Sequence, residues 1–337
     1  MSRARRARRV AAAAAYGGGG LTALTAVGVG VLAVEAKLAR RVVGRQFGPA
    51  GPEADAVYGA GPGTPLDLGV VGDSSADGLG ADTAEQTPGA IVAVGLAALA
   101  GRPVRLVNRA VVGADSRDLD RQVDDLLAEM PSPDAVLVMV GANDVVKRLR
   151  PPEAVRALGA AISRLREAGA EVVVGTCPDL GIVEPVAQPL RSLARRWSRE
   201  LAAAQTIAVV EAGGRSVSLG DLLSVEFRNA PELFSADRFH PSPAGYARAA
   251  AVLLPAVATS LGLWPVQEDS GRSERVVPVA QAAVAAAQEA GTEVEGARRD
   301  GADRGPLGQW ARLRRRAGAV AAPRARGQST PSSPSAT

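Results

Sequence analysis

A serine, a histidine and an aspartate occur where they could act as a nucleophile, its base and the group that orients the base. Ser74 follows an apolar stretch, within "VVGDSSADGLG". His240, the only histidine of the chain, lies within "SADRFHPSPAGY", and Asp237 precedes it by three residues. A serine hydroxyl is a weak nucleophile until a base takes its proton, and a carboxylate beside that base stabilises the imidazolium. These three residue types predict nucleophilic attack on a carbonyl group.

Such an attack also requires hydrogen-bond donors directed at the oxygen that becomes negatively charged. Three candidates are the backbone N–H groups of Ser74 and Gly113 and the side-chain amide of Asn143. Gly113 lies within "NRAVVGADS" and Asn143 within "VMVGANDV". Loss of one such donor typically costs about 3–4 kcal/mol of barrier stabilisation.

Short apolar segments alternate with helical patterns, and these elements must bring the polar residues together. Strands are predicted over residues 66–71, 104–108, 135–140, 171–175 and 207–210. Helices are predicted over residues 88–100, 118–130, 152–168, 189–204 and 243–261. Apolar strands that alternate with helices indicate a parallel sheet covered on both faces. We expect a three-layer α/β/α domain with a parallel five-stranded sheet over residues 64–264.

The candidate residues fall where ligands of such a sheet bind, outside the carboxyl ends of the strands. Ser74 follows the first predicted strand, Gly113 lies in the loop after the second, and Asn143 follows the third. Asp237 and His240 lie in the loop before the last helix. We therefore expect all five at one edge of the sheet.

The glycines and serines around Ser74 could instead form a phosphate-binding loop. A P-loop requires Gly-Lys-Ser/Thr, and this stretch contains no lysine. A dinucleotide-binding loop would place a pyrophosphate beside the negative charges of Asp73 and Asp77, which disfavours it. Ser75 is the rival nucleophile, but its position fits a helix N-cap better.

Several kinds of metal centre are excluded by residue counts. Cys177 is the single cysteine and His240 the single histidine, so cysteine zinc sites, multi-histidine sites and an internal disulfide are ruled out. An acidic run, Asp115, Asp118 and Asp120, follows Gly113. We interpret it as solvated charge at the start of a helix rather than as a metal site.

The charge distribution does not indicate a nucleic-acid-binding protein. The formal net charge is +4, and the basic clusters lie near the two ends of the chain: Arg3, Arg5, Arg6, Arg8, Arg9, Arg312, Arg314, Arg315 and Arg316. The middle of the chain has no arginine run interleaved with aromatic residues, so we expect no nucleic-acid partner.

The order of these segments and their residues resemble those of the SGNH (GDSL-type) hydrolase family over about residues 66–262. The matching blocks are Gly72-Asp73-Ser74, then Asn108 and Gly113, then Gly141-Ala142-Asn143-Asp144, and finally Asp237-Arg238-Phe239-His240-Pro241. The resemblance implies a flavodoxin-like three-layer fold. It also implies an esterase, a lipase or a carbohydrate deacetylase.

Residue by residue, the resemblance implies that Ser74 is the nucleophile, His240 the base and Asp237 the residue that orients the histidine. Gly113 and Asn143 complete the oxyanion hole with the Ser74 amide. The supporting residues are Asp73, which holds the loop, together with Asn108 and Asp144. No cofactor or metal is implied, because Ser-His-Asp chemistry needs none.

We therefore expect a serine hydrolase of carboxylic esters, in EC class 3.1, that works through an acyl-enzyme on a small-molecule, lipid or glycan ester. One alternative is a deacetylase of acylated carbohydrate. Another is a catalytically silent envelope protein that retains the fold.

The N-terminal residues 1–46 predict a membrane anchor or a signal segment. Residues 10–34 form a stretch of 25 uncharged residues after an arginine-rich start, and a bilayer-spanning helix needs about 20 residues. A cleaved signal peptide and a soluble helix packed on the domain are the alternatives. The slightly more basic N-terminal side favours a cytoplasmic N-terminus, and hence an anchored or secreted protein with an extracytoplasmic domain.

Two further segments are expected to lie outside the folded domain. Residues 47–63 are rich in glycine and proline and are interpreted as a linker. Residues 265–337 are rich in Ala, Arg, Pro and Ser, and apart from an alanine-rich helix over 276–290 we expect them to be largely disordered.

Overall fold

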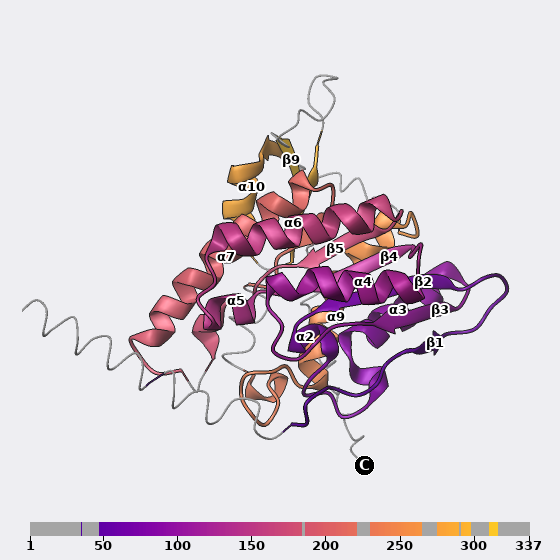
Figure 1. Ribbon diagram of the computed structural model, residues 1–337, viewed down its shortest axis with the longest axis horizontal. Coiled ribbons are helices and arrows are strands. Elements are labelled where there is room, and N and C mark those ends of the chain that lie inside the picture. The colour runs from indigo at the N-terminus through magenta and orange to yellow at the C-terminus, as the bar shows by residue number, and fades with distance from the viewer. Residues whose placement is uncertain are drawn as a thin grey trace, which may run out of the picture.

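The computed structural model describes residues 35, 47–183, 186–220, 230–264, 275–289, 291–297 and 310–315 (Figure 1). Within this part of the chain, nine strands form one sheet in the order β1-β3-β2-β4-β5-β6-β8-β9-β7. The short helices are α2 (Ser74–Asp77) and α5 (Ala142–Val146), with the 3-10 turns η1 (Ala84–Gln86), η2 (Ser116–Asp118), η3 (Leu180–Ile182) and η4 (Pro231–Leu233).

The centre of the sheet is parallel. Its strands are β2 (Leu66–Gly72), β3 (Val104–Asn108), β4 (Ala135–Met139), β5 (Glu171–Gly175) and β6 (Arg215–Val217). They pair in the order β3-β2-β4-β5-β6, which in chain order is the 2-1-3-4-5 arrangement of flavodoxin-like folds. The flavodoxin-like prediction is confirmed, although the whole sheet is larger and mixed.

Helices cover both faces of the sheet, which is why its strands are apolar throughout. Helices α3 (Pro88–Ala100) and α9 (Pro243–Ser260) pack on one face. Helices α4 (Leu119–Glu129), α6 (Pro151–Glu167) and α7 (Leu190–Glu211) lie on the other, and Figure 1 shows α4 and α6 in front of the strands. The three-layer architecture is as predicted.

The predicted fifth strand was wrong. Residues 207–210 belong to the last turns of α7, and the fifth parallel strand is β6, at Arg215–Val217. Residues 207–210 are apolar because they are buried on two sides. Val209 packs on the face of the sheet that α6 covers, and Val210 packs against helix α10 (Val279–Ala286). A short apolar run of this kind does not distinguish a buried helix from a strand.

The predicted linker contains part of the sheet. Strand β1 (Ala56–Tyr58) pairs antiparallel with β3, and Ala54 is buried in the core. The linker prediction is therefore wrong for these residues.

The prediction of a disordered tail is also wrong for its described part. Strand β7 (Arg275–Pro278), helix α10 (Val279–Ala286), strand β8 (Thr292–Gly296) and strand β9 (Trp310–Arg315) extend the sheet beyond β6. The alanines of α10 pack against α7. Arg215 and Arg314 both form ion pairs with Glu293 and Glu295. The charged residues of this segment, which favoured the prediction of disorder, are therefore paired with opposite charges on neighbouring strands.

The apolar N-terminal segment, residues 10–34, lies outside the described residues. Among those described, no helix combines the length and the apolar character needed to cross a bilayer.

Candidate active site

Ser74, His240 and Asp237 form a continuous series of hydrogen bonds. The Ser74 Oγ lies 2.9 Å from His240 Nε2, and His240 Nδ1 lies 2.6 Å from the Asp237 Oδ2. The three residues are buried, with relative exposures of 6%, 4% and 0%. In this arrangement an imidazole can take the hydroxyl proton while the carboxylate stabilises the imidazolium.

The position of Ser74 follows from the way β2 ends. Gly72 has φ +146°, and a Cβ at this position would lie 1.9 Å from the Met139 carbonyl oxygen on β4. Only glycine lets the backbone come this close to the Met139 carbonyl. The next residue, Asp73, can therefore donate its N–H to the same oxygen at 2.9 Å. Ser74 then begins α2 at the carboxyl end of the strand.

The N-cap of α2 is Asp73, and not Ser75 as predicted. The Asp73 Oδ1 accepts a hydrogen bond from the Ser75 N–H at 2.9 Å. Ser75 therefore lies inside the helix, whereas Ser74 is the serine in contact with His240.

A tight turn sets the geometry between Asp237 and His240. The Asp237 Oδ1 accepts hydrogen bonds of 2.9 Å from the N–H groups of Phe239 and His240 and from the Ser235 hydroxyl. Burial by itself raises the pKa of Asp237, but the hydrogen bond to the His240 ring and the attraction of the imidazolium outweigh it and hold the pKa below its usual value. The carboxylate is thus ionised at neutral pH. Ser235 was not among the residues predicted from the sequence.

Gly113 and Asn143 reach the same edge of the sheet by different routes. The loop that holds Gly113 is joined to the end of β2 by the Val111 N–H, which donates to the Gly72 carbonyl at 3.1 Å. Asn143 lies in α5, directly after β4, and its Nδ2 donates to the Ala114 carbonyl at 2.9 Å. A Cβ at Gly113 would meet no atom within 4 Å, so its backbone faces open space.

Asn108 and Asp144 fasten the surrounding loops. The Asn108 Nδ2 donates to the carbonyl of Ala76 in α2 at 3.2 Å. The Asp144 carboxylate accepts from the Ser116 N–H and hydroxyl at 3.1 and 3.0 Å, and burial raises its pKa.

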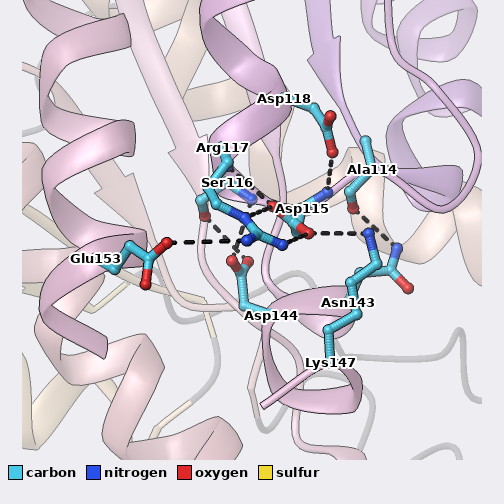
Figure 2. A network of polar contacts seen from close by, with 9 residues as sticks. All are labelled: Ala114, Asp115, Ser116, Arg117, Asp118, Asn143, Asp144, Lys147 and Glu153. Carbon is cyan, nitrogen blue, oxygen red and sulfur yellow. Dashed lines mark hydrogen bonds and ion pairs between the residues drawn. The ribbon is translucent and has the colours of Figure 1, made fainter. Parts of the chain in front are cut away.

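The prediction of solvated charge at a helix start holds for Asp120, in the first turn of α4, but is wrong for Asp115. Asp115 is 1% exposed and contacts both Arg117 and Lys147 (Figure 2). Asp118 accepts the Asp115 N–H, which closes a capping box. Asp120 is exposed and pairs with Arg164. The partners of Asp115 explain how its buried charge is tolerated.

Two buried glutamines that the sequence analysis missed hold the strand ends at this edge. The Gln122 amide of α4 accepts the Gly72 N–H at 2.7 Å and donates to the Gly72 carbonyl at 2.9 Å. The Gln205 amide of α7 accepts the Cys177 N–H at 2.7 Å and donates to the Val140 carbonyl at 3.0 Å. In the sequence, each glutamine is a polar residue among the apolar positions of its helix, which could have indicated a buried polar contact. Each amide bonds backbone groups that have no partner strand once the chain leaves the sheet.

Asp73→Asn is expected to remove a pH dependence of stability. Burial is the largest influence on Asp73 and raises its pKa from 3.8 to about 6, against the hydrogen bond from Ser75 and the attraction of His240. The folded protein holds this proton more tightly than the unfolded chain, so the free energy of unfolding falls as pH rises between these two values. Asparagine can accept the same hydrogen bond without titrating.

The stability difference between Asp73→Asn and wild type should therefore grow in favour of the variant from about pH 4 to pH 6, by about 2–3 kcal/mol, and level off above. Urea unfolding of both proteins at a series of pH values measures it. A difference that stays constant across this range contradicts the prediction.

Comparison with known proteins identifies the family. Residues 70–248 match the profile of the GDSL-like Lipase/Acylhydrolase family. The chain is 45% identical over 242 residues to a GDSL-like esterase of Mycobacterium tuberculosis, an alignment that covers 68% of this chain and 77% of that protein. The chain belongs to the GDSL-like lipase/acylhydrolase family, as its motifs predicted, and is an ester hydrolase.

Similar solved structures include an α/β hydrolase from the metagenome of Lake Arreo, at 21% identity and a TM-score of 0.47, covering 61% of this chain and 97% of that one. Another is a variant of an acetyl xylan esterase from Geobacillus stearothermophilus, at 22% identity and a TM-score of 0.44, covering 63% of this chain and 99% of that one. These similarities are too low to indicate a substrate.

Proposed function

We propose that this protein is a serine esterase that cleaves carboxylic esters through an acyl-enzyme on Ser74. The observation that carries the proposal is the series of contacts from the Ser74 Oγ to His240 Nε2 at 2.9 Å and from His240 Nδ1 to the Asp237 Oδ2 at 2.6 Å. His240 acts as the base and Asp237 orients it.

In the first half of the reaction the Ser74 Oγ bonds to the ester carbonyl carbon and its proton passes to His240 Nε2. The carbon–oxygen bond to the leaving alcohol breaks, and His240 returns the proton to that alcohol. Water then repeats the sequence on the acyl-enzyme, which releases the carboxylic acid and restores the serine hydroxyl.

The oxyanion formed on the way is assigned to three donors: the N–H groups of Ser74 and Gly113 and the side-chain amide of Asn143. The Asn143 amide nitrogen has two hydrogens, of which the Ala114 carbonyl takes one. The other is available to the substrate. The left-handed φ of +83° at Gly113, with open space beside it, supports close approach by a substrate oxygen.

An ester with an apolar acyl group fits the surroundings of this site. The chain has only four phenylalanines, and two of them, Phe47 and Phe239, pack edge-on against the His240 ring with centroid distances of 6.1 and 4.8 Å. Val111, on the Gly113 loop, is 38% exposed, and Val146, at the end of α5, is 41% exposed. We therefore infer that the mouth of the site favours a butyryl or longer chain over an acetyl group.

A fluorophosphonate probe tests the nucleophile, because it phosphonylates only an activated serine. We expect the probe to label Ser74, identified by mass spectrometry of the modified peptide, and to label a Ser75→Ala variant equally well. Folded protein that is not labelled would favour the silent envelope protein.

A panel of p-nitrophenyl esters of increasing chain length, together with acetylated sugars, tests the acyl group. We expect kcat/KM to rise from acetate to butyrate. Activity confined to acetylated sugars would instead identify a carbohydrate deacetylase.

We further infer that residues 1–46 anchor or export the protein, so that the hydrolase domain acts outside the cytoplasm. The basic start and the following 25 uncharged residues support this location. A reporter that is active only outside the cytoplasm, fused to the C-terminus, should be active, and an inactive fusion would contradict the proposal.

A further inference from the structure

The loop that holds Gly113 and the helix α5 that holds Asn143 follow strands that are not neighbours. Gly113 follows β3 and Asn143 follows β4, with β2 between the two strands. Backbone pairing links the two segments only indirectly, through the end of β2, where the Gly72 carbonyl accepts from the Val111 N–H and the Asp73 N–H donates to the Met139 carbonyl. Side-chain contacts join the Gly113 loop directly to α5.

Three consecutive residues of the Gly113 loop contact α5 (Figure 2). The Ala114 carbonyl accepts from the Asn143 Nδ2 at 2.9 Å, and the Ser116 N–H and hydroxyl donate to Asp144. Between them in the sequence, the Asp115 Oδ2 accepts from the Lys147 Nζ at 2.9 Å. The first two contacts hold the N-terminal turn of α5, and the lysine, at its C-cap, holds the other end.

Asp115 is built into this loop as a fixed anion. Its side chain is 2% exposed, and it accepts hydrogen bonds from the backbone and the guanidinium of Arg117 as well as from Lys147. The hydrogen bond from Arg117 and the bond from Lys147 hold the pKa of Asp115 below its usual range, although burial opposes them. Arg117 belongs to the same loop, so Lys147 is the partner that connects this anion to α5.

We propose that Asp115 and Lys147 are positioning residues, which set the distance between the Gly113 N–H and the Asn143 amide. This inference rests on the proposed function, in which both groups bind the oxyanion. The lysine side chain is 42% exposed, so its removal changes this link without opening the core. A displacement of one donor by about 1 Å lowers the rate about 100-fold in comparable sites.

Lys147→Met, which keeps an unbranched side chain one atom shorter and removes the charge, is the principal test. We expect kcat for p-nitrophenyl butyrate to fall about 10- to 100-fold while KM changes less than about twofold, because only the transition state carries the oxyanion. Lys147→Arg keeps the charge and should recover most of kcat. Phosphonylation of Ser74 should slow in parallel with kcat, because the phosphonyl oxygen occupies the same donors.

Arg121→Met is the matched control. Arg121 forms an exposed ion pair with Asp125 at 3.5 Å on α4, so the kcat of this variant should equal that of wild type. Urea unfolding of all variants accompanies the kinetics and distinguishes a loss of fold from a loss of rate.

A wild-type kcat in Lys147→Met, or a raised KM with unchanged kcat, would overturn the positioning role. Failure to recover kcat in Lys147→Arg would overturn it as well. The proposed function fails in a different way: wild-type protein would then not be labelled at Ser74, whatever the behaviour of Lys147.

Discussion

Ser74→Ala is expected to lower kcat for p-nitrophenyl butyrate by about a million-fold. The alanine has no hydroxyl to attack the carbonyl, and the neighbouring Ser75 lies one residue further into α2, where no contact to His240 replaces the lost one. In the proposed mechanism Ser74 is therefore the single nucleophile. The rate is measured with a large excess of enzyme, so that a residual activity can be separated from spontaneous hydrolysis.

The matched control is Ser75→Ala, which should retain kcat within about threefold, because the hydrogen bond that involves Ser75 uses its backbone N–H and not its hydroxyl. More than about 1% residual activity in folded Ser74→Ala would place the nucleophile elsewhere.

Asp237→Asn is expected to lower kcat by about 10,000-fold. The Oδ1 of Asp237 accepts two backbone N–H groups and the Ser235 hydroxyl, so this position must remain an oxygen in the variant. The new NH2 group is then directed at His240 Nδ1, where the carboxylate Oδ2 lay. The ring must therefore carry its proton on Nε2, the atom that faces Ser74, and it can no longer take the serine proton.

Steady-state kinetics measures this loss, and circular dichroism verifies the fold. Asp134→Asn provides the comparison, because its carboxylate also accepts a backbone N–H, from Asp67 at 2.7 Å, but at the amino-terminal edge of the strands. It should keep full activity. An Asp237→Asn enzyme within about tenfold of wild type would show that His240 works without the carboxylate.

The sequence predicted the residues whose placement depends on local pattern and on the parallel sheet. Ser74 and Asn143 come shortly after apolar strands. His240 is the single histidine of the chain, so it was the only candidate for the base, and Asp237, three residues before it, was the natural candidate to orient it. Such residues can be placed because the carboxyl ends of parallel strands share one edge.

What the sequence did not predict depends on partners distant along the chain. Asp115 was interpreted as solvated because its partner Lys147 is 32 residues away. Strand β6 has three residues and begins with Arg215, whose charge is matched by Glu293 and Glu295 on β8. No local window contains both members of such a pair, so the strand was assigned to the more apolar run before it.

The antiparallel strands at the C-terminal side of the sheet also affect the tendency of the protein to aggregate. Strand β8 occupies the edge of β6, which would otherwise offer unpaired backbone groups to strands of other molecules. In the described part of the chain, the outermost strand on this side is β7, which has four residues and ends in Pro278. Because proline has no N–H and the strand is short, this edge is a poor template for intermolecular pairing. The segment that was expected to be disordered thus protects the sheet against edge-to-edge association.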